Sequence, residues 1–309
     1  MMNDRIEIFE VGPRDGLQNE KLILSTMQKI ELIKGLQSAG IKRIEAGAFV
    51  RPDRVPQMAD SEQLQSELKS ELPSGDFYYL VPNLKGLERA MACGVKAIAV
   101  FTAASESFSM KNTGMTTKES VDTIRQMTEV ATRAGIKVRG YVSTAFGCPF
   151  EGRIASAKVI PVIEQMLSLP LEQVSIGDTI GVASVKGTDE VLKPLLRQVD
   201  PSKIAVHFHD TRGTALVNSF RAFELGVRTI DSSIGGLGGC PFAPGASGNL
   251  ATEDLVYFFK EMNVETGVDY RKLCETSLSL ARGMGGRILS SRALQAYLAN
   301  CQKNSIWDS

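Results

Sequence analysis

Short apolar runs rich in β-branched residues alternate with longer amphipathic stretches along nearly the whole chain. The longer stretches repeat their apolar residues at helical spacing, for example over 27–39, 118–134 and 252–262. The short runs predict eight strands, at 6–11, 43–49, 77–81, 97–101, 137–142, 173–176, 204–208 and 229–233. Regular alternation of strands and helices is typical of parallel β/α architecture.

Residues that favour helix ends punctuate this pattern. Asn83, before 84–91, and Thr117, before Lys118, are predicted N-caps because their side chains can accept from the first free backbone N–H groups. Glycines at 40, 94, 135 and 226 fall where a helix should end and a strand begin. These signals divide the chain into strand–helix units.

The number of units favours a closed (β/α)₈ TIM barrel, which typically needs about 250 residues. An open doubly wound sheet is the alternative, but no G-x-G-x-x-G motif follows the first predicted strand. We therefore expect a TIM-barrel domain over residues 1–266. Residues 267–309 contain two helical patterns, 270–281 and 291–299, and no strand pattern. We expect this C-terminal helical extension to pack on the barrel within the same domain or to form an oligomer contact.

Composition narrows the class of partner. Lys and Arg number 35, as do Asp and Glu, and aromatic residues make up 6% of the chain, which disfavours nucleic acid and anionic membranes as partners. No stretch approaches the roughly 20 apolar residues of a membrane span, and the first ten residues lack a signal-peptide core. The cysteines are sparse, contain no C-x-x-C pair, and fit a reducing compartment: Cys93, Cys148, Cys240, Cys274 and Cys301. We expect a cytoplasmic protein.

The chain has only two histidines, His207 and His209, and both occur in a run that otherwise reads as a buried strand. Side chains two positions apart on a strand share one face, with the imidazoles about 6–7 Å apart. In a barrel they would face the lumen at the carboxyl end of the strand, where active sites of this fold lie. A pair of core histidines is the alternative. The pairing favours a metal site.

Oxygen ligands for such a metal are available at the same rim. Asp15 follows the first predicted strand, and Asn249 ends a glycine-rich segment after the eighth. Together with the two histidines they would give a mixed set of nitrogen and oxygen ligands with open positions. This set points to Mg²⁺ or Mn²⁺ rather than to structural zinc, which prefers thiolates and a closed shell.

The glycine-rich segment spans residues 235–249 and contains Cys240. Much glycine costs backbone entropy, so the segment suits a lid that closes over a substrate and excludes water. A thiol there could transfer a proton if its pKa were tuned. A flexible surface turn with an inert cysteine is the alternative.

Four motifs carry a resemblance to a known family: VGPRDGLQNE (11–20), HFHDT (207–211), GLGGCPF (236–242) and NLATEDLVY (249–257). They closely resemble the 3-hydroxy-3-methylglutaryl-CoA (HMG-CoA) lyases, in order from about residue 5 to about residue 270. The resemblance implies retro-Claisen cleavage of an acyl-CoA substrate to acetyl-CoA and acetoacetate, with a divalent cation, as in leucine degradation. It also implies a homo-oligomer, a dimer or larger.

The resemblance also implies residue roles. Asp15, His207, His209 and Asn249 would hold the cation, which lowers the pKa of the C3 hydroxyl. Asp15 or a water on the cation would be the base. The other roles are enolate stabilisation by Arg14, enolate protonation by Cys240, positioning by Glu45, a pocket position for Asp178 after the sixth strand, and substrate binding by Gln18 and Thr179. Separately, Lys111 and Asn112, beyond the fourth predicted strand, are candidate contacts for the nucleotide side of CoA, with solvated loop residues as the alternative.

Two departures from the family bear on specificity. Ala48 stands where the family usually has a hydroxyl residue, and Arg212 stands where many members have tyrosine. Arg212 could pair with a carboxylate or lie in solvent. These changes leave open another substituent at C3 of the substrate. A related acyltransferase joining acetyl-CoA to a 2-oxo acid is a further alternative, disfavoured by Asp210-Thr211 and Cys240-Pro241. A barrel without activity, serving as a binding module, is disfavoured by the complete ligand set.

Overall fold

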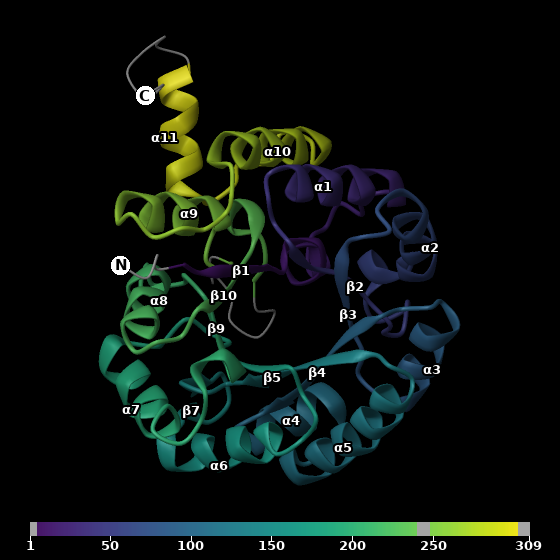
Figure 1. Cartoon of the computed structure of the whole chain (residues 1–309), viewed down its shortest axis with the longest axis vertical. Helices are drawn as coiled ribbons and strands as arrows, with labels where there is room; N and C mark the ends of the chain where they lie inside the picture. The colour runs from purple at the N-terminus through teal and green to yellow at the C-terminus, as the bar shows by residue number, and fades with distance from the viewer. Residues whose placement is uncertain (1–4, 240–247, 302–309) are drawn as a thin grey trace.

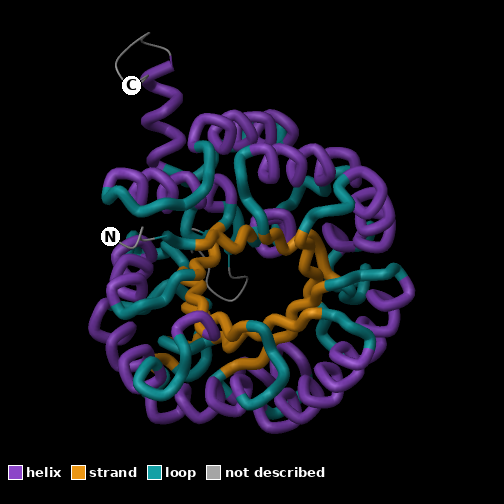
Figure 2. Tube along the Cα trace, viewed as in Figure 1, coloured by secondary structure: helices purple, strands orange, loops and turns teal. Residues whose placement is uncertain are grey.

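Eight parallel strands close into a barrel surrounded by helices (Figures 1 and 2). A computed structural model describes residues 5–239 and 248–301. The strands run in the order β1-β10-β9-β8-β5-β4-β3-β2, and β2 closes the cylinder by pairing with β1. Their bounds are β1 Glu7–Glu10, β2 Arg43–Ala48, β3 Asp76–Leu80, β4 Ala97–Ala103, β5 Lys137–Ser143, β8 Gln173–Asp178, β9 Ile204–Phe208 and β10 Thr229–Ser232. The predicted TIM barrel and its eight strands are confirmed.

Helices surround the barrel, and most of them are amphipathic and bury their apolar side toward it. Their bounds are α1 Thr26–Ser38, α2 Ser61–Glu71, α3 Leu84–Ala92, α4 Glu106–Thr113, α5 Thr117–Arg133, α6 Ser156–Leu167, α7 Val185–Leu195, α8 Ala215–Glu224, α9 Thr252–Glu261, α10 Tyr270–Gly283 and α11 Arg292–Cys301. Shorter elements are η1 Gly12–Gly16, η2 Pro56–Met58, η3 Pro201–Lys203, η4 Ile234–Gly236 and the hairpin of β6 Gly147–Cys148 with β7 Gly152–Arg153, which the sequence pattern did not predict.

Helix-end signals were mostly read correctly. Asn83 caps α3, since its side chain accepts from the backbone N–H of Gly86 at 2.9 Å. Each of the four predicted glycines has a positive φ, between 69° and 105°, which only glycine adopts readily. The predicted cap Thr117 is wrong by one position. Thr116 caps α5 because Glu119 at N3 completes a reciprocal capping box with it.

The C-terminal helices pack on the barrel's helical layer. α10 lies against α1, where Thr276 fits the space left by Gly35. The carboxylate of Asp254 on α9 accepts from Ser291 Oγ at 2.7 Å and from the backbone N–H of Ala293 at 2.8 Å, which anchors the start of α11. α11 then projects away from the barrel (Figure 1). The division at residues 266/267 stays a prediction.

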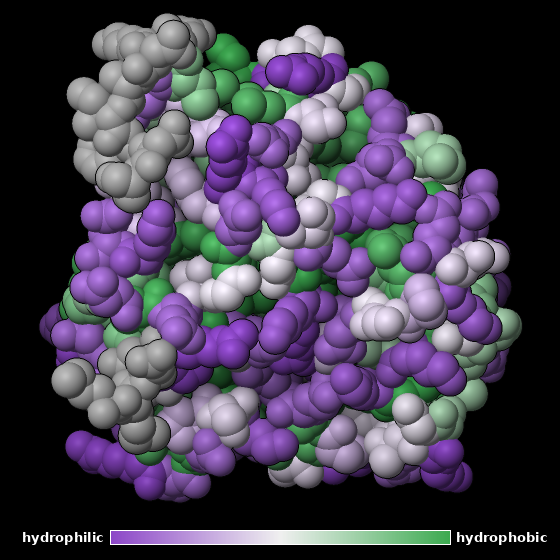
Figure 3. Space-filling view, turned by 45° about the horizontal axis from the view of Figure 1, so that its top comes forward, coloured by the Kyte–Doolittle hydropathy of each residue, from purple (hydrophilic) through white to green (hydrophobic). Residues whose placement is uncertain are grey.

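The face shown in Figure 3 is mostly polar, with apolar side chains in scattered areas between charged ones. Within the described residues, no helix has the length and apolar character that crossing a membrane would need.

Candidate functional site

The turn after β1 places two charged side chains at the carboxyl mouth of the barrel. Pro13, Arg14 and Asp15 lie within the single π-helical turn η1. Glu10, buried at the end of β1, accepts from the backbone N–H of Gly12 at 2.7 Å. A Cβ at Gly12 would lie 2.6 Å from that carboxylate oxygen, so only glycine permits this approach. The turn is thereby fixed to the strand that carries it.

The four predicted metal ligands meet at this mouth. The Nε2 atoms of His207 and His209 lie 3.2 Å apart, and potential ligand atoms of Asp15 and both histidines all lie within 4.8 Å of one another. Asn249 joins them, since its Nδ2 donates to Asp15 Oδ2 at 2.9 Å. The imidazole rings are closer than strand spacing predicts, with centroids 5.2 Å apart. His209 lies just beyond the end of β9, in an isolated antiparallel β-bridge with Asn249.

Unpartnered polar atoms show that this cluster fits a cation. Asn249 Oδ1 and His209 Nδ1 are buried and have no hydrogen-bond partner among the described residues. Such atoms are costly unless something binds them. Imidazole nitrogens with carboxylate and amide oxygens form a donor set suited to a divalent cation. A cation between them would satisfy the amide oxygen and separate the two facing imidazoles.

Charge is strongly coupled across the cluster. Burial opposes ionisation of Asp15, but the charge of Arg14, with smaller contributions from the histidines, lowers its pKa to about 2. Burial and the neighbouring His207 lower the pKa of His209 to about 4. Asp15 is therefore anionic and His209 neutral near neutral pH, which are the forms that ligate metals. So low a pKa makes Asp15 a weak base.

Arg14 is held by two carboxylates. Its Nε and Nη2 lie 2.6 Å and 2.5 Å from Glu45 Oε2, and its Nη1 lies 2.6 Å from Asp15 Oδ1. Glu45 on β2 is fully buried, and burial raises its pKa against the opposing effect of Arg14. Glu45 thus contacts Arg14 directly and orients the guanidinium toward the mouth. Charge-assisted pairs of this kind are short and geometrically specific.

Asp178 ends β8 and does not follow it, because β8 is longer than predicted. Its two carboxylate oxygens each accept from a backbone N–H at 2.9 Å, one from Val182 and one from Ala183. Burial raises its pKa to about 6. This geometry favours holding the following turn, and a direct catalytic role stays a prediction. Thr179 is half-buried, and its Oγ1 accepts from the backbone N–H of Thr144 at 2.8 Å.

Of the remaining predicted site residues, Gln18, Lys111 and Asn112 lie in the described part of the chain and Cys240 does not. Gln18 is half-buried just after η1. Lys111 and Asn112 are exposed on α4, with Lys111 Nζ 3.7 Å from the centroid of the Phe150 ring. Cys240 falls in residues 240–247, outside the described part of the chain.

Arg212 is exposed, as one of its two alternatives expected, but its guanidinium also makes hydrogen bonds. Its Nη1 donates to the backbone carbonyls of Ile180 at 3.0 Å and Gly181 at 2.9 Å. It therefore ties the β9 loop to the turn after β8. The two loops lie together because β8 and β9 are neighbouring strands of the barrel.

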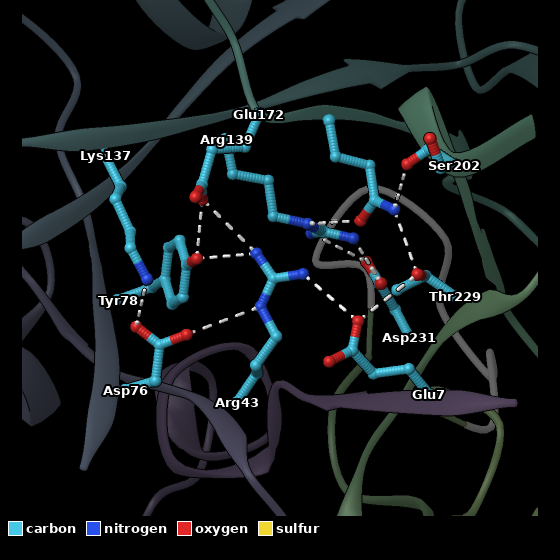
Figure 4. Close-up of polar contacts among 11 residues, drawn as sticks. Glu7, Arg43, Asp76, Tyr78, Lys137, Arg139, Glu172, Ser202, Thr229 and Asp231 are labelled. Carbon is cyan, nitrogen blue, oxygen red and sulfur yellow. Dashed lines mark hydrogen bonds and ion pairs between the residues drawn. The ribbon is translucent and has the colours of Figure 1, made fainter. Parts of the chain in front are cut away.

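Buried charges beneath the ligands were missed by sequence reasoning. Arg139 on β5 and Asp231 on β10 form an ion pair in the lumen at 2.5 Å (Figure 4). The signal was available, because an arginine within the apolar run of 137–142 and an aspartate within that of 229–233 are unusual for barrel strands.

Fold and ligand cluster define the class: a (β/α)₈ barrel with a candidate divalent-cation centre at the carboxyl mouth of its strands. A family model described as HMGL-like matches residues 5–279, and the chain belongs to this family. It is 46% identical over 292 residues to human mitochondrial hydroxymethylglutaryl-CoA lyase, covering 94% of this chain and 89% of that one. A cytoplasmic 3-hydroxy-3-methylglutaryl-CoA lyase of Rattus norvegicus is 44% identical, covering 94% and 84%.

A solved relative carries ligands. The structure of an HMG-CoA lyase from Acinetobacter baumannii in complex with coenzyme A and 3-methylmalate superposes with a TM-score of 0.90 at 36% sequence identity. The match covers 96% of each chain. The resemblance read from the four sequence motifs is confirmed.

Proposed function

We propose that this protein is a divalent-metal-dependent lyase that cleaves 3-hydroxy-3-methylglutaryl-CoA to acetyl-CoA and acetoacetate. The observation that carries the proposal is the convergence of Asp15, His207, His209 and Asn249 at one mouth of the barrel, beside Arg14. Family membership supports the same reaction, because the similar proteins named above are HMG-CoA lyases.

Those four ligands would hold the cation, and we propose Mg²⁺ or Mn²⁺. When bound there, the cation would polarise the C3 hydroxyl of the substrate and lower its pKa. Asp15, being anionic and paired with Arg14, suits the ligand role better than that of general base, so a water at the cluster would take up the C3 hydroxyl proton.

Arg14 would stabilise the negative charge that moves onto the thioester oxygen as the C2–C3 bond breaks. Glu45 keeps its guanidinium oriented through a buried pair. Because the guanidinium is oriented before the reaction begins, it stabilises the negative charge that develops in the transition state more than it stabilises the uncharged ground state. Cys240 would protonate the C2 carbon of the resulting enolate and so release acetyl-CoA. Asp178 would act through the turn that it holds, which also presents Thr179.

Substrate contacts complete the proposal. Thr179 would meet the substrate carboxylate, and Gln18, next to the Arg14 turn, would bind the acyl portion. Lys111 and Asn112 would contact the nucleotide side of CoA, since both are exposed on the helix that follows β4.

We also propose a homo-oligomer, a dimer or larger, in the cytoplasm. The named relatives include both mitochondrial and cytoplasmic lyases.

Ala48 leaves one variant of this function open. It is buried at the end of β2, and its methyl group replaces the hydroxyl usual at this position in related proteins. A substrate with a different group at C3 of the glutaryl chain is therefore the second candidate. Condensation of acetyl-CoA with a 2-oxo acid is the competing reaction class.

Cleavage assays on the purified protein test the proposal. The substrates are HMG-CoA and a panel of glutaryl-CoA derivatives that differ at C3, with Mg²⁺ or Mn²⁺ added. We expect acetyl-CoA and acetoacetate from HMG-CoA, and loss of both products after chelation. Failure to cleave any member of the panel at full metal occupancy would contradict the proposal. Condensation of acetyl-CoA with 2-oxo acids would establish the acyltransferase instead.

A further inference from the structure

The lumen beneath the candidate metal centre contains a buried ion pair that spans the barrel. Arg139 and Asp231 come from β5 and β10, and neither is more than 1% exposed. Arg139 Nη2 lies 2.5 Å from Asp231 Oδ1, and its Nη1 lies 3.2 Å from Oδ2 (Figure 4). The guanidinium carbon is 3.9 Å from the centroid of the Phe9 ring and 4.9 Å from that of Tyr141. Arg139 therefore holds the Asp231 carboxylate in one fixed orientation.

The same carboxylate also contacts a metal ligand. Asp231 Oδ2 lies 3.2 Å from His207 Nδ1 and accepts from Ser175 Oγ at 2.9 Å. His207 and Asp231 are direct partners in the register of β9 and β10, so the contact follows from the sheet itself. An ionised carboxylate only accepts hydrogen bonds, which places the imidazole proton on Nδ1 and leaves the Nε2 lone pair free. That lone pair faces the ligand cluster.

The second histidine lacks this support. His209 Nδ1 is buried and has no hydrogen-bond partner among the residues that the structure describes. The two ligands are thus built differently: His207 is backed by a carboxylate, whereas His209 is oriented by its neighbours at the mouth alone. The contrast argues that Asp231 acts on one ligand specifically.

We propose that Asp231, held by Arg139, is a positioning residue that fixes the tautomer and ring orientation of His207 for cation binding. The inference rests on the proposed metal centre. A carboxylate behind a ligating imidazole raises the basicity of the ligand, and losing it typically costs about 10- to 100-fold in metal affinity. The competing explanation is that Asp231 only neutralises the buried charge of Arg139.

Metal titration of matched variants separates these explanations. Asp231→Asn removes the carboxylate charge, but it also leaves Arg139 buried without a counter-ion. The double variant Arg139→Gln/Asp231→Asn restores neutrality and guards against loss of folding. Ser175→Ala removes one neutral hydrogen bond to the same carboxylate and is the control. The Mn²⁺ dissociation constant is measured by electron paramagnetic resonance on protein without substrate.

We expect about 10- to 100-fold weaker Mn²⁺ binding in both the single and the double variant, and a far smaller change in Ser175→Ala. Wild-type Mn²⁺ affinity in the folded double variant would overturn the proposal, because Asp231 would then serve Arg139 alone. Absence of Mn²⁺ binding by the wild-type protein would instead refute the proposed function.

Nuclear magnetic resonance gives a readout that needs neither metal nor substrate. The chain has two histidines, so ¹⁵N-histidine labelling yields two imidazole spin systems, assigned with His209→Gln. At alkaline pH, we expect His207 to carry its proton on Nδ1 in the wild-type protein and to lose this preference in Asp231→Asn. A proton on Nε2 of His207 in the wild-type protein would overturn the proposal.

Discussion

Both ends of the barrel are rich in charged and polar side chains, but these side chains are paired differently at the two ends. At the amino end, Arg43 Nη1 lies 3.2 Å from Glu7 Oε2. Its Nη2 lies 3.4 Å from Glu172 Oε2 and 2.5 Å from the hydroxyl oxygen of Tyr78 (Figure 4). Its Nε has no hydrogen bond, yet lies 3.7 Å from Asp76. At the carboxyl mouth, by contrast, Asn249 Oδ1 and His209 Nδ1 are buried without partners among the described residues.

The difference shows which property marks a functional site. Charge density alone does not, because the guanidinium of Arg43 is surrounded by carboxylates and a tyrosine hydroxyl, and even its Nε, which makes no hydrogen bond, has Asp76 as a charged neighbour. Buried polar atoms without partners cost free energy. Where such atoms lie next to other potential metal ligands, a bound cation is the simplest group that would satisfy them. The contrast supports the carboxyl mouth as the candidate site, whereas the charges around Arg43 are already paired with one another, which favours a structural role.

The largest expected effects separate two tasks at the mouth. His207→Ala should weaken Mn²⁺ binding and abolish most cleavage. Cys240→Ser should leave Mn²⁺ affinity nearly intact while lowering kcat by about 100-fold or more, since a lost general acid typically costs 10²–10⁴ in rate. Calorimetric Mn²⁺ titration and a cleavage assay on both variants check this. Equal loss of metal from both would contradict the separation of the two tasks.

A pair of arginine substitutions compares the two ends directly. Arg14→Gln should lower kcat by about 100- to 1,000-fold, the cost of losing one preorganised electrostatic contact. Arg43→Gln should leave kcat close to wild type but lower the free energy of unfolding by about 1–3 kcal/mol, because it leaves carboxylates and a tyrosine with fewer partners. Steady-state kinetics and urea denaturation measure the two effects. A large loss of kcat in Arg43→Gln would abolish the distinction between the ends.

A smaller expected effect is the pH dependence of stability that arises from one buried carboxylate near the mouth. Glu253 on α9 is buried, and accepts from the backbone N–H of Gly235 at 2.9 Å and from Ser277. Burial raises its pKa from 4.5 to about 7. The unfolded chain therefore ionises first as pH rises, so the stabilising contribution of protonated Glu253 is complete below pH 4.5 and is lost as pH rises through about 7.

Glu253→Gln removes this titration. Its stability relative to wild type should therefore rise with pH over that window, by at most about 3 kcal/mol. Thermal melts of both proteins at the acidic and alkaline ends of the window measure the difference. Glu261→Gln, at an exposed position of the same helix, is the control and should show no such trend. A constant difference in Tm between Glu253→Gln and wild type would contradict the raised pKa.

Local sequence signals predicted the strands and the barrel, and they also predicted that the four candidate ligands would lie at one rim. Alternating β and α patterns fix which segments become strands, and parallel strands bring their carboxyl ends to one rim. His207 and His209 share a face by strand geometry alone, and Asp15 follows the first strand. Their convergence could therefore be inferred without coordinates. The cap at Thr116 and the end of β8 were misplaced by one or two residues, because competing hydrogen bonds decide such boundaries.

Contacts between strands that are far apart in sequence were decided only by the tertiary structure. The partner of Arg139 is 92 residues away, and that of Arg14 is 31 residues away on β2. Arg212 binds carbonyls of a neighbouring loop for the same reason. A sequence specifies which groups are charged, but their partners depend on barrel closure and register, which set the distances that decide whether a buried polar atom is satisfied.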